Sequence, residues 1–124
     1  MQVLIYTKDD NEYLELKKVI TGISEANEVY RDPSDGHGHY SGTYDIVVVA
    51  LDGAKGLNEV TEWADRTKTR IVWITDDKEF AGVAIRKHVS DFIIRPYTEE
   101  RIKESVTGII KDCGFDNIWH ITAI

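Results

Sequence analysis

The sequence predicts an α/β fold in which helices cover both faces of a parallel sheet. Short apolar runs alternate with amphipathic segments along most of the chain. The run Ile46–Ala50 is apolar at every position, which is typical of a strand buried from both sides. No apolar run approaches the length that a membrane span needs. These observations favour one soluble α/β domain, which suits a chain of 124 residues.

The elements follow one another as strand and helix in regular alternation. We expect strands at Gln2–Thr7, Glu28–Tyr30, Ile46–Ala50, Arg70–Thr75 and Phe92–Ile94. We expect a first helix that is capped by Asp9 or Asp10 and fades at residues 25–27, and further helices at Lys55–Arg66, at Glu79–Val89 and from Glu99 to Gly114. Such alternation predicts a flavodoxin-like doubly wound sheet of five parallel strands in the order 2-1-3-4-5.

Two segments do not fit this alternation. Residues 31–43 contain a proline and three glycines and little that is apolar, so the second helix of the fold is expected to be short or missing. Residues 115–124 form an apolar tail, for which an extra strand, a linker and a contact with a partner remain open. We therefore divide the chain into a domain at 1–114 and a tail at 115–124.

Local signals mark the starts of two helices. Asp9 and Glu12 have the spacing of a capping box, in which each side chain bonds to the backbone of the other. Thr98 precedes a first turn that contains Glu99 and Glu100, which are favourable near the positive end of the helix dipole.

Composition excludes several functions. The net charge of −7 argues against a nucleic-acid surface. A single cysteine excludes an internal disulfide and favours the cytoplasm. No glycine-rich phosphate loop follows the first strand, and no nucleophile elbow is present, so we expect no enzymatic activity. Because no apolar run is long enough to span a membrane, we expect no membrane association.

At four places the chain resembles the receiver domain of two-component response regulators, the CheY-like superfamily. The segment SDFIIRPY, residues 90–97, is similar to the last strand of receivers, which ends in Lys-Pro and an aromatic residue. RIVWIT ends in Thr75 at the position of the conserved hydroxyl, YDIVVVA matches the strand that ends in the phosphorylated aspartate, and VLIY matches the first strand.

The departures from the family are at the phosphorylation site. Receivers bind Mg²⁺ through a pair of acids and the phosphoacceptor Asp, and a Lys and a hydroxyl contact the phosphoryl group. Here Thr7 and Lys8 occupy the acid positions, Ala50 the phosphoacceptor position and Arg95 the lysine position; only Thr75 is retained. The resemblance therefore implies an atypical receiver, a pseudo-receiver, without a metal ion or other cofactor.

Three acids lie close to the degenerate positions and leave an alternative open. Asp52 lies two residues beyond Ala50, and Asp9 and Asp10 lie two beyond Thr7 and Lys8. A shift of two residues along a strand keeps the side chain on the same face, about 6.6 Å further out. These acids form a possible shifted Mg²⁺ site, although we expect its phosphoryl group to lie too far from Thr75.

Arg95 and Phe92 also have expected roles. The resemblance implies a cis peptide bond between Arg95 and Pro96. The guanidinium of Arg95 would then point to the place of the phosphorylation site in receivers, where we expect it to pair with Asp52 or Asp9. Phe92 matches the aromatic position that switches in receivers, although a core phenylalanine is equally consistent with the pattern.

The functional expectation is a phosphorylation-independent signalling or regulatory module that binds a protein partner, an effector domain or a second copy. The alternative is a phosphoacceptor in a two-component phosphorelay that uses Asp52 with Mg²⁺. Receivers commonly bind partners through a face that here includes Arg86, Lys87, Tyr97 and Arg101. A weaker hypothesis places a small-ligand site near the loop at residues 31–43. His37 and His39, with Asp35 or Asp32, could also hold a metal ion, but metal sites usually need three or four converging ligands, so we expect none.

Overall fold

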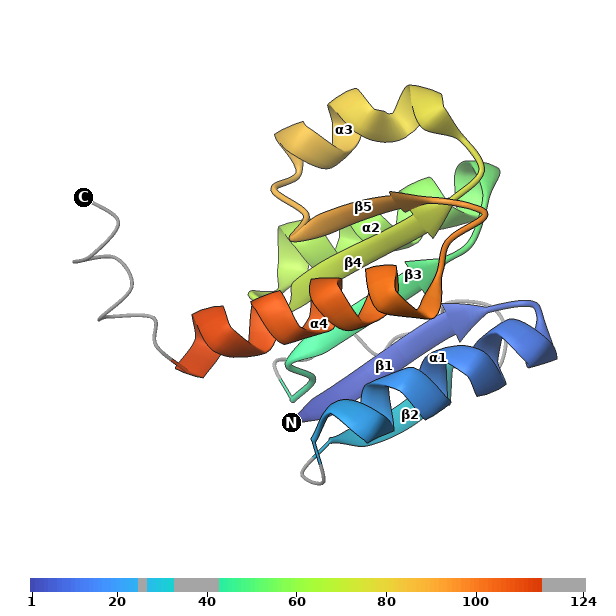
Figure 1. Ribbon diagram of the computed structural model, residues 1–124. Coiled ribbons are helices and arrows are strands. Elements are labelled where there is room, and N and C mark those ends of the chain that lie inside the picture. Colours follow the sequence, from blue (N-terminus) through green and yellow to red (C-terminus); the bar gives the residue numbers. More distant parts are fainter. Residues whose placement is uncertain (25–26, 33–42, 115–124) are drawn as a thin grey trace.

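Five parallel strands form one sheet in the predicted order β2-β1-β3-β4-β5 (Figure 1). The computed structural model describes residues 1–24, 27–32 and 43–114. The strands are β1 Gln2–Thr7, β2 Glu28–Asp32, β3 Ile46–Ala50, β4 Arg70–Thr75 and β5 Asp91–Ile94. The helices are α1 Asp10–Ile23, α2 Gly53–Arg66, α3 Ala81–Arg86 and α4 Glu99–Gly114, with a short 3-10 helix, η1, at Lys78–Phe80.

The sheet lies between two helical layers. Helices α1 and α4 cover one face and α2 and α3 cover the other (Figure 1). No described residue between β2 and β3 is helical, while residues 33–42 and the tail at 115–124 lie outside the described residues. The loop hypothesis on His37 and His39 and the three readings of the tail therefore stay predictions.

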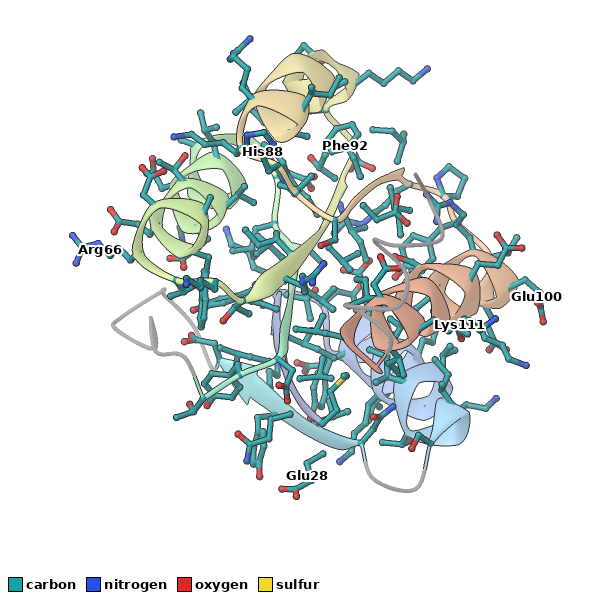
Figure 2. All side chains as sticks on the ribbon, turned by 90° about the vertical axis from the view of Figure 1, so that its left-hand side faces the viewer. Glu28, Arg66, His88, Phe92, Glu100 and Lys111 are labelled. Atoms are coloured by element: carbon teal, nitrogen blue, oxygen red, sulfur yellow. The ribbon has the colours of Figure 1, made fainter. Side chains whose placement is uncertain are left out.

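The central strand β3 is buried at all five positions, as its sequence predicts. Alternate residues face opposite helical layers because successive side chains on a strand point to opposite faces. Val48 and Ala50 thus pack with α1 and α4, whereas Val47 and Val49 pack with α2. Figure 2 shows that charged side chains such as Arg66, Glu100 and Lys111 point outward, away from these two cores.

The caps of two helices are confirmed, but the capping box is only half formed. Asp9 accepts hydrogen bonds from the backbone N–H groups of Asn11 and Glu12 at 2.8 and 3.3 Å. Thr98 accepts one from the N–H of Arg101 at 3.1 Å. Glu12 does not return a bond to Asp9, because its carboxylate is engaged in the site described below.

The helix predicted at Glu79–Val89 is shorter than expected. It is divided into η1 and α3, and α3 ends at Arg86. His88 adopts a left-handed conformation, with φ 56°. The N–H groups of His88 and Val89 bond to the carbonyls of Ile85 and Ala84, which is the hydrogen-bond pattern of a Schellman motif. This helix end could not be predicted from the sequence, because the motif usually has glycine where this chain has His88.

Candidate functional site

The predicted site residues meet at one edge of the sheet. Parallel strands bring their carboxyl ends to a common edge, and Thr7, Ala50 and Thr75 are the last residues of β1, β3 and β4. Arg95 follows β5 directly, and its peptide bond to Pro96 is cis. An open pocket of about 600 Å³ lies there, lined by Thr7, Lys8, Asp9, Asn11, Glu12, Glu15, Ala50, Leu51, Asp52, Asp76, Arg95, Pro96 and Tyr97.

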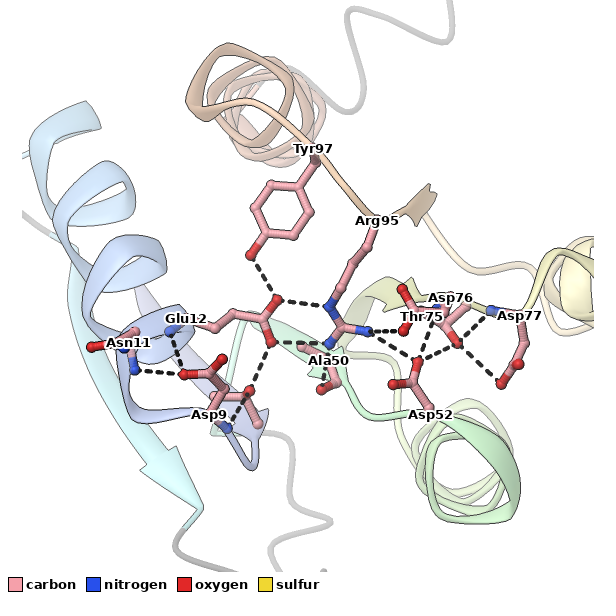
Figure 3. A network of polar contacts seen from close by, with 11 residues as sticks. Asp9, Asn11, Glu12, Ala50, Asp52, Thr75, Asp76, Asp77, Arg95 and Tyr97 are labelled. Atoms are coloured by element: carbon pink, nitrogen blue, oxygen red, sulfur yellow. Dashed lines mark hydrogen bonds and ion pairs between the residues drawn. The ribbon is translucent and has the colours of Figure 1, made fainter.

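The guanidinium of Arg95 lies inside this pocket and makes four hydrogen bonds with the chain (Figure 3). Its Nε and Nη2 donate to the two carboxylate oxygens of Glu12 at 2.9 and 3.0 Å. Nη2 also donates to the carbonyl of Ala50, and Nη1 donates to Asp52, both at 3.0 Å. The carboxylate of Asp76 lies 4.0 Å from Nη1. One side chain therefore connects α1, β3 and two of the loops that follow strands.

Glu12 is more buried than the other charged side chains that contact Arg95, with 10% of its side chain exposed against 48% for Asp52 and 62% for Asp76. Besides Arg95, it accepts hydrogen bonds from the hydroxyls of Thr7 and Tyr97, both at 2.8 Å. Burial raises the pKa of Glu12, but the hydrogen bonds from Arg95, Thr7 and Tyr97 outweigh burial and leave the pKa below its usual value. Glu12 is consequently held as a carboxylate.

Asp52 forms the second anchor of Arg95. Its Oδ1 accepts hydrogen bonds from the Thr75 hydroxyl and from the Asp76 N–H, both at 2.9 Å. Burial acts to raise the pKa of Asp52, while the bonds from Asp76, Thr75 and Arg95 lower it, and the net pKa is below the usual value. Its side chain is still 48% exposed.

The expectation that Asp52 is remote from Thr75 was wrong. Strand β3 ends at Ala50, and Asp52 is the N-cap residue of α2. The Asp52 carboxylate lies 2.9 Å from the Thr75 hydroxyl at the end of β4. Gly53, the next residue, adopts a left-handed φ of 62°, and its N–H donates to the carboxylate of Asp77 at 2.9 Å, which holds the loop against the end of β4.

The other acids of the shifted site have contacts of their own. Asp9 caps α1, and Asp10 pairs with Arg31 at 2.8 Å. Among residues 1–24, 27–32 and 43–114, no cluster of three or more acid, histidine or cysteine side chains could hold a metal ion. Asp9, Asp10 and Asp52 are therefore not brought together as one set of ligands.

Glu12, rather than Asp9, joins Asp52 as the partner of Arg95, and sequence reasoning missed it. The signal was present in α1. Glu12, Leu16 and Ile20 are four residues apart and all buried, so they share the face that packs on the sheet. A buried carboxylate at the end of an apolar face needs a cation or several hydrogen-bond donors. The prediction instead assigned Glu12 to a capping box with Asp9, and so did not look for such a cation.

The remaining predicted site positions are Thr7, Lys8 and Ala50. Ala50 presents a methyl group and is 3% exposed. Lys8 is exposed at the rim of the pocket, and Thr7 donates to Glu12 instead of holding a cation. The ionisable side chains of the lining are five acids, Asp9, Glu12, Glu15, Asp52 and Asp76, against two bases, Lys8 and Arg95. Such a pocket is suited to a cation, and the cation present is the guanidinium of Arg95.

Phe92 lies on the opposite side of the sheet. It packs edge-on against Trp73, with ring centroids 5.4 Å apart, and Trp73 in turn stacks on Phe80. This aromatic cluster links β4 and β5 to η1. Phe92 is thus partly buried in the core between the sheet and the layer of α2 and α3.

The chain has the fold of a response-regulator receiver domain. It is similar to the response regulatory domain of protein mrkE from Klebsiella pneumoniae, with a TM-score of 0.73, 25% identity, and 90% of this chain and 96% of that chain covered. A CheY-like response regulator from Mesorhizobium loti gives a TM-score of 0.66 at 19% identity, covering 87% and 97%.

The same fold occurs in proteins named for another process. The pilus assembly protein CpaE from Caulobacter crescentus is similar with a TM-score of 0.68 at 16% identity, covering 87% of this chain and 98% of that chain. No model of a protein family matches the sequence, and neither does any curated protein. In the part of the chain that the structure describes, no helix is long and apolar enough to cross a membrane.

Proposed function

We propose that this chain is a pseudo-receiver: a cytoplasmic, non-enzymatic signalling module that works without phosphorylation. The observation that carries the proposal is the position of Arg95. Its guanidinium is bound by Glu12, Asp52 and the Ala50 carbonyl at the place where a receiver would hold a metal ion and a phosphoryl group. Ala50 cannot form an acyl phosphate. In this pocket the guanidinium of Arg95 pairs with the carboxylates of Glu12 and Asp52, so no bound metal ion is needed to offset their charge.

The network also supports one fixed arrangement of the loops. Thr75 donates its hydroxyl to Asp52, so the hydroxyl that contacts a phosphoryl group in receivers already has a carboxylate partner. Asp77 accepts from Gly53 and ties the same two loops together. In our proposal these two hydrogen bonds hold the loops in one arrangement, which in receivers depends on phosphorylation.

We propose that the module acts through the face formed by α3, β5 and α4, toward a protein partner, an effector domain or a second copy. Ile85 on α3 is 76% exposed beside the exposed Arg86. The other residues expected at this face are engaged within the chain: Lys87 with Asp65, Arg101 with Asp91, and Tyr97 with Glu12. Ile85 and Arg86 are therefore the residues of this face that we assign to the partner.

One observation favours the alternative, a phosphoacceptor that uses Asp52. Its carboxylate is 48% exposed and lies 2.9 Å from the Thr75 hydroxyl. Under this alternative Arg95 takes the role of the receiver lysine, and Mg²⁺ has to bind with carboxylates that now contact Arg95.

A titration with beryllofluoride and Mg²⁺ separates the two functions. Amide shifts of Thr75, Asp76 and Gly53 are followed by NMR in the wild type and in Asp52→Asn. The pseudo-receiver predicts no saturable shifts in either protein. Saturable shifts in the wild type that disappear in Asp52→Asn support the phosphoacceptor instead.

A further inference from the structure

The contacts of Arg95 have the geometry of a recognition site for a guanidinium group. Two parallel bonds to one carboxylate form the bidentate fork that guanidinium makes and ammonium cannot. A backbone carbonyl and a second carboxylate take further N–H groups on the other side. The acceptors come from α1, from the end of β3 and from the loop after β3 (Figure 3), and the two parallel bonds to one carboxylate favour the shape of a guanidinium as well as its charge.

The walls of this site are preorganised independently of Arg95. Glu12 is held by the hydroxyls of Thr7 and Tyr97, and 10% of its side chain is exposed. Asp52 is held by Thr75 and by the N–H of Asp76. Acceptors that are already held in place reduce the entropy cost of binding a ligand, and these bonds do not involve Arg95.

We propose that the pocket is a guanidinium-binding site which Arg95 fills in cis as an autoinhibitory contact, and that an arginine side chain of a partner protein is the class of ligand that competes for it. The inference rests on the proposed function, in which no phosphoryl group occupies this place. When Arg95 withdraws, Glu12 and Asp52 remain as two carboxylates arranged for the same group.

Chemical rescue of the full chain tests the proposal. In Arg95→Ala, ethylguanidinium raises the thermal midpoint saturably, by about 3–5 °C at roughly ten times its dissociation constant. Ethylammonium, with the same charge, and urea, with a similar planar shape, have much weaker effects. The rescue disappears in Glu12→Gln/Arg95→Ala and is absent in the wild type. Equal effects of ethylguanidinium and ethylammonium, or no rescue, overturn the proposal.

A second measurement needs no deletion of Arg95. In the wild type, nitrogen-15 NMR of arginine side chains is expected to show separate, slowly rotating Nη signals for Arg95 and averaged signals for the exposed Arg86. Glu12→Gln is expected to average the Arg95 signals. If Arg95 behaves like Arg86 in the wild type, no guanidinium site exists, whether or not Arg95→Ala folds.

The two proposals fail in different ways. A phosphoryl or beryllofluoride adduct on Asp52 contradicts the proposed function. Absent or unselective rescue, without such an adduct, contradicts only the guanidinium site.

Discussion

Arg95 and Glu12 are 83 residues apart in sequence, yet two parallel hydrogen bonds of 2.9 and 3.0 Å join their side chains at the carboxyl edge of the sheet. The pair connects α1 to the loop between β5 and α4. Tyr97, at the end of that loop, donates to the same carboxylate. The first helix and the last helix are thereby fastened to one another through the pocket.

Loss of the Glu12 carboxylate is expected to lower the stability of the protein. Glu12→Gln leaves the partly buried guanidinium without its bidentate partner and should lower the free energy of unfolding by about 2–3 kcal/mol. Glu15→Gln, an exposed acid one turn further along α1, is the matched control and should change it by about 0.5 kcal/mol or less. Urea unfolding of the three proteins measures both values. Equal effects of the two substitutions would show that the pair adds no net stability.

The pH dependence of stability follows from the lowered pKa values of Glu12 and Asp52. A carboxyl group whose pKa is lower in the folded state than in the unfolded state stabilises the fold. This stabilisation is complete when the pH is above the pKa of the unfolded state, and it is lost as the pH falls through the pKa of the folded state. We therefore expect the free energy of unfolding to decline below the ordinary values of 4.5 for Glu12 and 3.8 for Asp52.

Unfolding followed between about pH 3 and pH 7 measures this decline. The double variant Glu12→Gln/Asp52→Asn should have a flatter profile than the wild type over the acidic part of that range. Parallel profiles for the two proteins would mean that other carboxylates control the acid sensitivity.

Gly56 fixes the approach of α2 to the loop after β3. A Cβ atom at Gly56 would lie 2.1 Å from the backbone oxygen of Leu51, whereas one at Gly22 in α1 would meet nothing within 4 Å. Gly56→Ala should therefore destabilise the protein by about 2–3 kcal/mol, and Gly22→Ala should stabilise it by about 0.5–1 kcal/mol. Thermal unfolding distinguishes the two, and a harmless Gly56→Ala would contradict the packing of this loop.

The fold could be predicted because its signals are local. Each buried strand is a short apolar run, and the alternation with helices leaves few topologies. The site was only partly predictable. Ala50, Thr75 and Arg95 could be placed from the strands that they end, but the link between Arg95 and Glu12 depends on packing between segments that are far apart in sequence. The close approach of Asp52 to Thr75 likewise joins the loop after β3 to the end of β4, which lie 23 residues apart in sequence.

The proposed contact face predicts a specific effect of Ile85. Its side chain is 76% exposed, so Ile85→Glu should leave the monomer's stability nearly unchanged while it weakens association with a second copy or with a partner. Leu14→Glu alters another exposed apolar residue, 61% exposed, on α1 and serves as the control. Sedimentation at high protein concentration measures self-association. If Leu14→Glu weakens it and Ile85→Glu does not, the contact lies on the other face of the molecule.

In the proposed pseudo-receiver the pocket is complete without a phosphoryl group. Incubation of the wild type with acetyl phosphate and Mg²⁺, followed by intact-mass measurement, tests this proposal. The mass should stay unchanged, because Ala50 offers no nucleophile and the carboxylates of Glu12 and Asp52 are already paired with Arg95. A mass increase of one phosphoryl group that is absent in Asp52→Asn would contradict it.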